Sequence, residues 1–157
     1  MGALPLHRDF IGREFASAGT YEVSREKIRD FADAIGDRSP VYRSTEAAKE
    51  AGHPDVIAPP TFLTVVNFRL GAGPVGDADL GLDYSRVVHG EQRFVHHRPA
   101  RAGDVLKGVS TVTDIRDAGR NELMTTKTEI TTVEGEQVCT AYSTIVSRGT
   151  ASSASGG

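Results

Sequence analysis

The chain has 157 residues, of which 38% are hydrophobic and 25% are charged, and its formal net charge is −3 at pH 7. This length fits one domain with a substantial core, and the small net charge argues against nucleic acid as the main partner. No apolar run approaches the roughly 18 residues of a membrane span, and the N-terminus lacks the order of a secretory signal. The single Cys139 excludes an internal disulfide and a cysteine metal cluster. We therefore expect a cytoplasmic protein.

The first predicted element is a helix within TYEVSREKIRDFADAIGD. Ser24 is placed to cap this helix and Gly36 to end it. Its apolar residues recur at intervals of three and four and form one face: Ile28, Phe31, Ala32 and Ile35. After the loop GDRSPVYRS, Ser44 is placed to cap a second, short helix over TEAAKEAG.

The most apolar segment follows, HPDVIAPPTFLTVVNFRLGAG. Its tandem prolines exclude a helix interior, but Pro60 suits the first helical position. The pattern predicts a helix from about Pro60 to Leu70, apolar on most sides and therefore largely buried. Residues 71–76 are expected to form a loop.

The remainder is typical of strands. SRVVHGEQRFVHHRP contains Gly90, which can mark a bulge, and three further segments rich in Val, Thr and Ile are separated at Gly119 and Gly135. Helices followed by antiparallel strands predict an α+β fold, and a curved antiparallel sheet wrapped around one apolar helix is the hotdog fold. We expect residues 1–148 to form this single domain and residues 149–157 to form a disordered tail. Pairing of exposed sheet edges predicts a dimer or a larger assembly.

Two residues of the GDRSPVYRS loop are candidates for catalysis. Asp37 follows the helix end, where an aspartate commonly stabilises a turn and can also hold a water or act as a base. Tyr42 can hydrogen-bond with such a group, but an unperturbed tyrosine titrates near 10 and is a poor base at neutral pH.

The start of the apolar helix is a candidate binding site. Unpaired N–H groups at a helix N-terminus can stabilise the oxyanion of a thioester carbonyl. Pro59 and Pro60 have no N–H, so the first available donors belong to Thr61 and Phe62.

The histidines do not indicate a metal site. His96 and His97 are adjacent in a predicted strand and point to opposite faces, so they cannot share one metal. His89 beside Gly90 lies where a ligand can approach the backbone, or else it bonds to a neighbouring carbonyl. We expect neither a metal nor another cofactor.

Four stretches together resemble the N-terminal type of MaoC-like dehydratase: YEVSREKIRDFADAIGD, GHPDVIAPPTF, LDYSRVVHGEQRF and RPARAGDVL. The resemblance covers about residues 10–148. It implies a relationship to R-specific enoyl-CoA hydratases and to the Had-type (3R)-hydroxyacyl-ACP dehydratases of actinobacteria. The substrate that it implies is an acyl thioester on ACP or CoA, in fatty-acid or polyketide metabolism.

Active members of that family carry an Asp-x-Asn-Pro-x-His loop, and a glycine at the start of the central helix donates its N–H to the thioester. In this sequence Asp37 and Pro40 match the loop, while Ser39 replaces the Asn and Tyr42 replaces the His. Pro60 falls at the position of the donor glycine. The resemblance therefore implies a chain that lacks a near-neutral base and one oxyanion donor.

Several functions stay open on the sequence. The first is a non-catalytic substrate-channel subunit, paired with a MaoC-like subunit that supplies the Asp and His. The second is an active homodimeric hydratase that uses Asp37 together with His89 or a water chain through Tyr42. The third is an acyl-thioester-binding hotdog protein without turnover, and thioesterase activity also fits the fold. In the first two, the residues expected to contact substrate are Pro60, Thr61, Phe62, His89 and Gly90.

Overall fold

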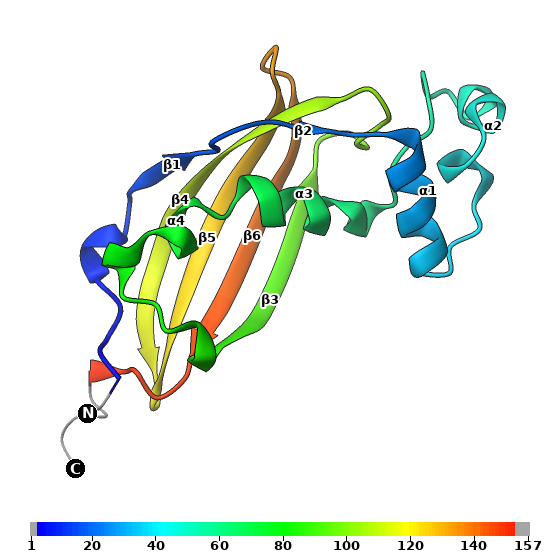
Figure 1. The fold of residues 1–157 in the computed structure, drawn as a ribbon. Helices are drawn as coiled ribbons and strands as arrows, with labels where there is room; N and C mark the ends of the chain where they lie inside the picture. The colour runs from blue at the N-terminus through cyan, green and yellow to red at the C-terminus, as the bar shows by residue number, and fades with distance from the viewer. Residues whose placement is uncertain (1–2, 153–157) are drawn as a thin grey trace.

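A computed structural model describes residues 3–152, in which a curved antiparallel sheet wraps around one helix, α3 (Figure 1). The sheet has six strands in the order β1-β4-β5-β6-β3, and β2 also pairs with β4. Four long strands make up most of it: β3 (Val87–His96), β4 (Val105–Ala118), β5 (Asn121–Thr132) and β6 (Gln137–Ser147). The predicted α+β hotdog fold is confirmed.

Alternating side chains give the sheet one buried face and one polar face. In β5, every second residue from Glu122 to Thr132 is buried against the concave side, and the residues between are partly exposed. On the outer face the hydroxyls of Thr125 and Thr144 are hydrogen-bonded at 2.9 Å. The concave face is therefore the one that α3 covers.

The central helix begins with a tighter turn than the sequence predicts. A 3₁₀ turn, Pro60–Phe62, leads directly into α3 (Leu63–Leu70). Gly108 on β4 permits close packing, because a Cβ there would lie only 2.9 Å from the Cβ of Leu70. The residues of α3 that are at most 3% exposed are Leu63, Val66 and Leu70.

Helices α1 (Arg25–Ala34) and α2 (Thr45–Glu50) lie beyond one end of the sheet (Figure 1). The side chains of Ser24 and Ser44 each accept a first-turn backbone N–H, at 3.1 and 3.2 Å, so both predicted caps are confirmed. The predicted apolar face is wrong at its last residue. Ile35 follows the end of α1, and 49% of its surface is exposed.

Several short elements, among them two strands and a one-turn helix, were not predicted from the sequence. Strands β1 (Glu14–Ala16) and β2 (Tyr21–Glu22) are too short to show alternation and are defined by their pairing with β4. Within the expected loop at residues 71–76 there is a one-turn helix, α4 (Gly73–Gly76). In the part of the chain that the structure describes, no helix has the length and apolar character that a membrane crossing needs.

The buried carboxylate of Glu122 connects both ends of the described chain. Its Oε2 accepts the Leu6 N–H at 2.9 Å and the Thr150 hydroxyl at 2.6 Å, and its Oε1 accepts from Arg8 at 3.1 Å. Thr150 and Ala151 are each 3% exposed. The start of the predicted tail, residues 149–152, thus differs from the expectation of disorder because it packs on the domain. Residues 153–157 lie outside the described residues.

Candidate functional site

The loop between α1 and α2 begins with Asp37, whose backbone and side chain both stabilise the turn. Its N–H donates to the carbonyl of Ala32 at 2.9 Å, and its Oδ1 accepts the N–H of Ser39 at 3.0 Å. Gly36, with a φ of 73°, ends the helix just before it, as predicted. Asp37 therefore has the structural role of an Asx-type turn residue.

Arg43 fastens the same loop to α1. Its guanidinium donates to the backbone carbonyl of Asp37 at 2.9 Å and forms an ion pair with Asp33 at 2.6 Å. The carbonyl of Arg43 accepts from Nε of Arg29 at 3.0 Å. These local bonds fasten the loop to α1.

Tyr42 lies at the position where the MaoC-like resemblance implies a histidine. Its ring is partly buried and packs against the main hydrophobic core. Burial raises the pKa of its hydroxyl, and the charge of Asp37 raises that pKa further. The hydroxyl is therefore protonated at neutral pH and can donate a hydrogen bond, but it cannot serve as a general base.

The start of the central helix offers fewer donors than expected. The N–H of Phe62 donates to the carbonyl of Pro59 at 2.9 Å. The Phe62 side chain is fully buried, with its ring 5.5 Å from that of Phe31 in an edge contact. Pro60 and Thr61 are exposed. Of the two predicted N–H donors, only that of Thr61 is left for a ligand.

A separate cavity of about 160 Å³ lies between the concave face of the sheet and the α3–α4 segment. One wall is a chain of polar groups that the sequence did not predict. Nδ2 of Asn67 donates to Oγ of Ser143 at 3.1 Å, and Ser143 donates to Oε1 of Gln92 at 2.6 Å. Asn67 Oδ1 is buried and has no partner among residues 3–152. The apolar lining includes Phe68, Val75, Met124 and Ile145.

His89 belongs to this cavity and not to the Asp37 loop. Its Nε2 lies 3.3 Å from Oε1 of Gln92, and it lines the cavity that contains neither Asp37 nor Tyr42. Next to it, Gly90 forms the predicted β-bulge, where the register with β6 shifts. The structure thus places His89 and its neighbour Gly90 in a different region from Asp37 and Tyr42.

The remaining reactive side chains have structural surroundings. Cys139 is buried, and burial raises its thiol pKa to about 11. Nε2 of His97 lies 3.0 Å from Oγ1 of Thr140. Within the described range, His, Cys, Asp and Glu side chains do not gather in groups of three that could bind a metal.

The chain matches known proteins along nearly its whole length. The family described as "FAS1-like, dehydratase domain region" matches residues 9–141. The chain belongs to this family. A UPF0336 protein of Saccharopolyspora erythraea is 59% identical to it over 148 residues, which cover 94% of this chain and 95% of that relative.

Solved structures place this dehydratase-region chain among the MaoC-like hotdog proteins. A chain of the C-terminally truncated HadBC (3R-hydroxyacyl-ACP dehydratase) complex of Mycobacterium tuberculosis has a TM-score of 0.76 and 29% identity, over 88% of this chain and 97% of that one. A protein described as a MaoC-like dehydratase has a TM-score of 0.79 and 29% identity, over 91% of this chain and 43% of that one. The resemblance to MaoC-like dehydratases is confirmed.

The polar wall of the cavity was detectable only in part from the sequence. Asn67 was detectable as the one amide in the apolar run LTVVNFRL. Gln92 and Ser143 gave no signal, because their side chains meet only when β3 pairs with β6. Together they form a polar wall in a cavity that is otherwise apolar.

Proposed function

We propose that this chain is a non-catalytic, substrate-channel subunit of a (3R)-hydroxyacyl-thioester dehydratase. It acts in the cytoplasm on an acyl chain carried by ACP or CoA, beside a MaoC-like subunit that supplies the catalytic Asp and His. The observation that carries the proposal is that Tyr42 occupies the position of the missing base. Its hydroxyl is protonated at neutral pH, and burial raises its pKa further above neutrality.

The start of the central helix supports the same conclusion. Pro60 has no N–H, and the N–H of Phe62 is already bonded to Pro59. Of the residues at this helix start, Thr61 is left with an N–H that can stabilise a thioester oxyanion. In other enzymes the loss of one such donor lowers the rate by about 10²–10³.

The cavity beneath α3 and α4 supports a channel role. Its apolar lining, which includes Phe68, Val75 and Met124, suits a hydrocarbon chain. The amide of Asn67 and the hydroxyl of Ser143 provide hydrogen-bonding groups on one wall. A hydroxylated acyl chain has both characters.

The open edge of the sheet supports a hotdog partner. Among the described strands, β3 pairs only with β6, so its other edge is free along residues 87–96. Apolar side chains are exposed on and beside this strand: Val88 at 43%, Val95 at 39% and Phe68 on α3 at 76%. A long exposed edge with apolar neighbours is typical of a surface that another chain covers.

The test is to assay hydration of crotonyl-CoA by the chain alone and by the chain co-expressed with a MaoC-like hotdog protein from the same genome that has an intact Asp/His loop. We expect turnover only with the partner. Asp37→Asn in this chain should leave the rate of the complex unchanged, and the matching change in the partner should abolish it.

Two other outcomes would contradict the proposal. Strong activity of the isolated chain that Asp37→Asn removes would identify a homodimeric hydratase. Acyl-thioester binding without turnover in either preparation would identify a binding protein.

A further inference from the structure

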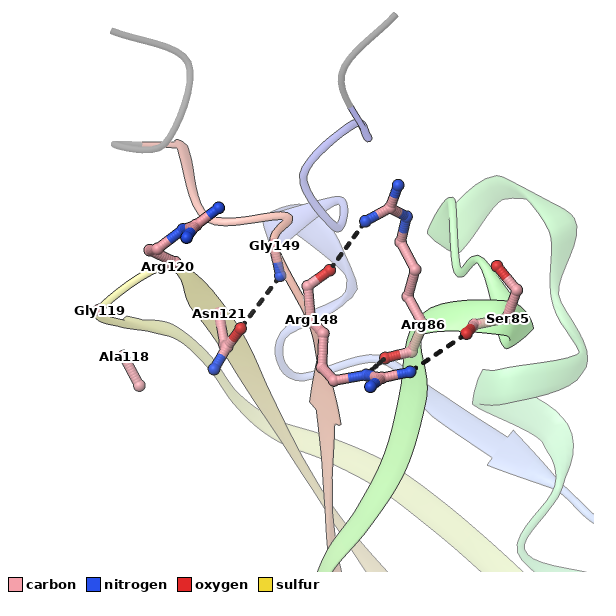
Figure 2. A pocket seen from close by; sticks show the side chains of 8 residues that line it. All are labelled: Ser85, Arg86, Ala118, Gly119, Arg120, Asn121, Arg148 and Gly149. Carbon is pink, nitrogen blue, oxygen red and sulfur yellow. Dashed lines mark hydrogen bonds between the residues drawn. The ribbon is translucent and has the colours of Figure 1, made fainter. Parts of the chain in front are cut away.

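A second cavity, of about 770 Å³, is shown in Figure 2. The strand ends that surround it lie at the end of the sheet opposite α1 and α2 (Figure 1). Three separate segments line it: the turn before β3, the β4–β5 hairpin and the residues after β6. Of its eight lining residues, only Ala118 carries an apolar side chain. Such a lining does not suit an acyl chain, and this cavity is distinct from the one beneath α3.

Arginine is the dominant residue of this cavity. Arg86, Arg120 and Arg148 line it, although the chain as a whole has a net charge of −3. Among residues 3–152, only Arg86 of the three has a carboxylate within 4.0 Å, that of Asp83 at 3.3 Å. The cavity therefore holds a local excess of positive charge.

The three arginines have different roles. Nε of Arg148 donates to the carbonyl of Arg86 at 3.2 Å, and its Nη2 donates to the carbonyl of Ser85 at 3.4 Å. Arg148 thus braces the turn that carries Arg86. Figure 2 shows the side chains of Arg86 and Arg120 on either side of Gly149.

The backbone between these two side chains is also held in place. The Gly149 N–H donates to Oδ1 of Asn121 at 3.0 Å, which ties the end of β6 to the β4–β5 hairpin. The hairpin carries Arg120, so the segments that carry Arg86 and Arg120 are each bonded to residues 148–149 after β6. These hydrogen bonds hold the three lining segments together.

We propose that this cavity binds the phosphate group of a small ligand, with Arg86 and Arg120 in contact and Arg148 as a positioning residue. A guanidinium presents several N–H donors in a planar fork that matches phosphate oxygens. One fork satisfies a carboxylate, whereas a phosphate has enough oxygens for two. The site goes beyond the proposed function, because binding there requires neither turnover nor a partner subunit.

Calorimetric titration at low salt tests the proposal, with inorganic pyrophosphate, CoA, pantetheine and citrate as probes. We expect saturable binding of pyrophosphate and CoA and none of pantetheine, which lacks phosphate. Tighter binding of CoA indicates a phosphate carried on a larger ligand, and equal binding indicates that a free phosphate suffices. Either result supports the proposal. Binding of citrate as tight as that of pyrophosphate would overturn it.

The double variant Arg86→Met/Arg120→Met should weaken phosphate binding by about tenfold or more. Arg116→Met is the control outside the cavity. It removes one positive charge, whereas the double variant removes two. Arg116 lies near the same end of β4, pairs with Asp114 at 3.2 Å and does not line the cavity. Thermal melting should show both variants folded. No saturable binding by the wild type, or an equal loss in both variants, would overturn the proposal.

The role of Arg148 is tested by Arg148→Lys, which keeps the charge but cannot brace both carbonyls. A weaker Kd with an unchanged salt dependence and an unchanged Tm supports positioning. A wild-type Kd would overturn that role.

Discussion

Burial of the Tyr42 ring raises the pKa of its hydroxyl, and the neighbouring Asp37 carboxylate raises it further. The Asp37 side chain in turn accepts the N–H of Ser39 and so stabilises the turn that leads to Tyr42. A neutral imidazole in place of Tyr42 would act as a base beside the same carboxylate, whereas the tyrosine stays protonated. At this position the loop therefore carries a hydroxyl that stays protonated at neutral pH.

The first prediction is a gain of activity. Tyr42→His with Pro60→Gly introduces the base and the N–H donor that the MaoC-like resemblance implies. We expect the isolated double variant to hydrate crotonyl-CoA at least about tenfold faster than the wild type, below the 10²–10⁴ or so that a positioned base contributes. The rate should fall as the pH drops below about 6.5, where histidine becomes protonated.

Two further variants control this experiment. Tyr42→Phe with Pro60→Gly supplies no base and should show no gain. Adding Asp37→Asn to the active double variant should remove the gained activity. Activity that persists without Asp37 would mean that the histidine does not work through this loop.

The second prediction concerns the cavity beneath α3. Ala72 is exposed and lines this cavity, so Ala72→Phe should block it without disturbing the core. In the complex with a catalytic partner, kcat/KM should fall about tenfold or more for long acyl thioesters and less for crotonyl-CoA. Ala78→Phe, at an exposed position outside the cavity, is the matched control. Equal losses in both variants, or no dependence on chain length, would argue against an acyl channel here.

The parts of this fold that were predictable from sequence depend on local physics. The caps at Ser24 and Ser44 and the bulge at Gly90 follow from what neighbouring residues can do. The parts that were missed depend on contacts between distant segments. The bond from Asn67 to Ser143 spans 76 positions and exists only because the sheet curves beneath α3. The use of the Phe62 N–H by Pro59 also depended on a 3₁₀ turn where an α-helical start was expected.

The third prediction concerns the buried Glu122 carboxylate, which connects both ends of the described chain. Oε2 of Glu122 accepts hydrogen bonds from two donors. In Glu122→Gln, the amide oxygen can keep these two bonds only if the NH2 group faces the donor that Oε1 now accepts from; otherwise both bonds are lost. We expect a loss of about 2–3 kcal/mol in the free energy of unfolding, and a Tm lower by about 4–12 °C. Glu129→Gln is the control, since Glu129 lies on the outer face of the same strand and pairs with Lys127 at 2.7 Å. Its effect should stay below about 1 kcal/mol. Equal effects of the two substitutions would show that the buried carboxylate contributes no special stability.

The last prediction follows from the Cys139 thiol. Burial raises its pKa from 9.0 to about 11, so the folded state holds the thiol proton more tightly than the unfolded chain does. The resulting contribution of the neutral thiol to the free energy of unfolding is fully present below pH 9 and is lost as the pH rises through about 11. Relative to Cys139→Ala, the wild type should therefore lose up to about 2–3 kcal/mol of unfolding free energy across this range.

Urea denaturation of both proteins at intervals from pH 8 to 11 measures this difference. Tyr21 and Tyr42, whose pKa values burial also raises, are present in both proteins, so their contributions cancel. The cavity left by Cys139→Ala lowers stability by a constant amount at every pH, which leaves the slope as the informative quantity. Parallel curves for the two proteins would show that the thiol is not held in its neutral form by the core.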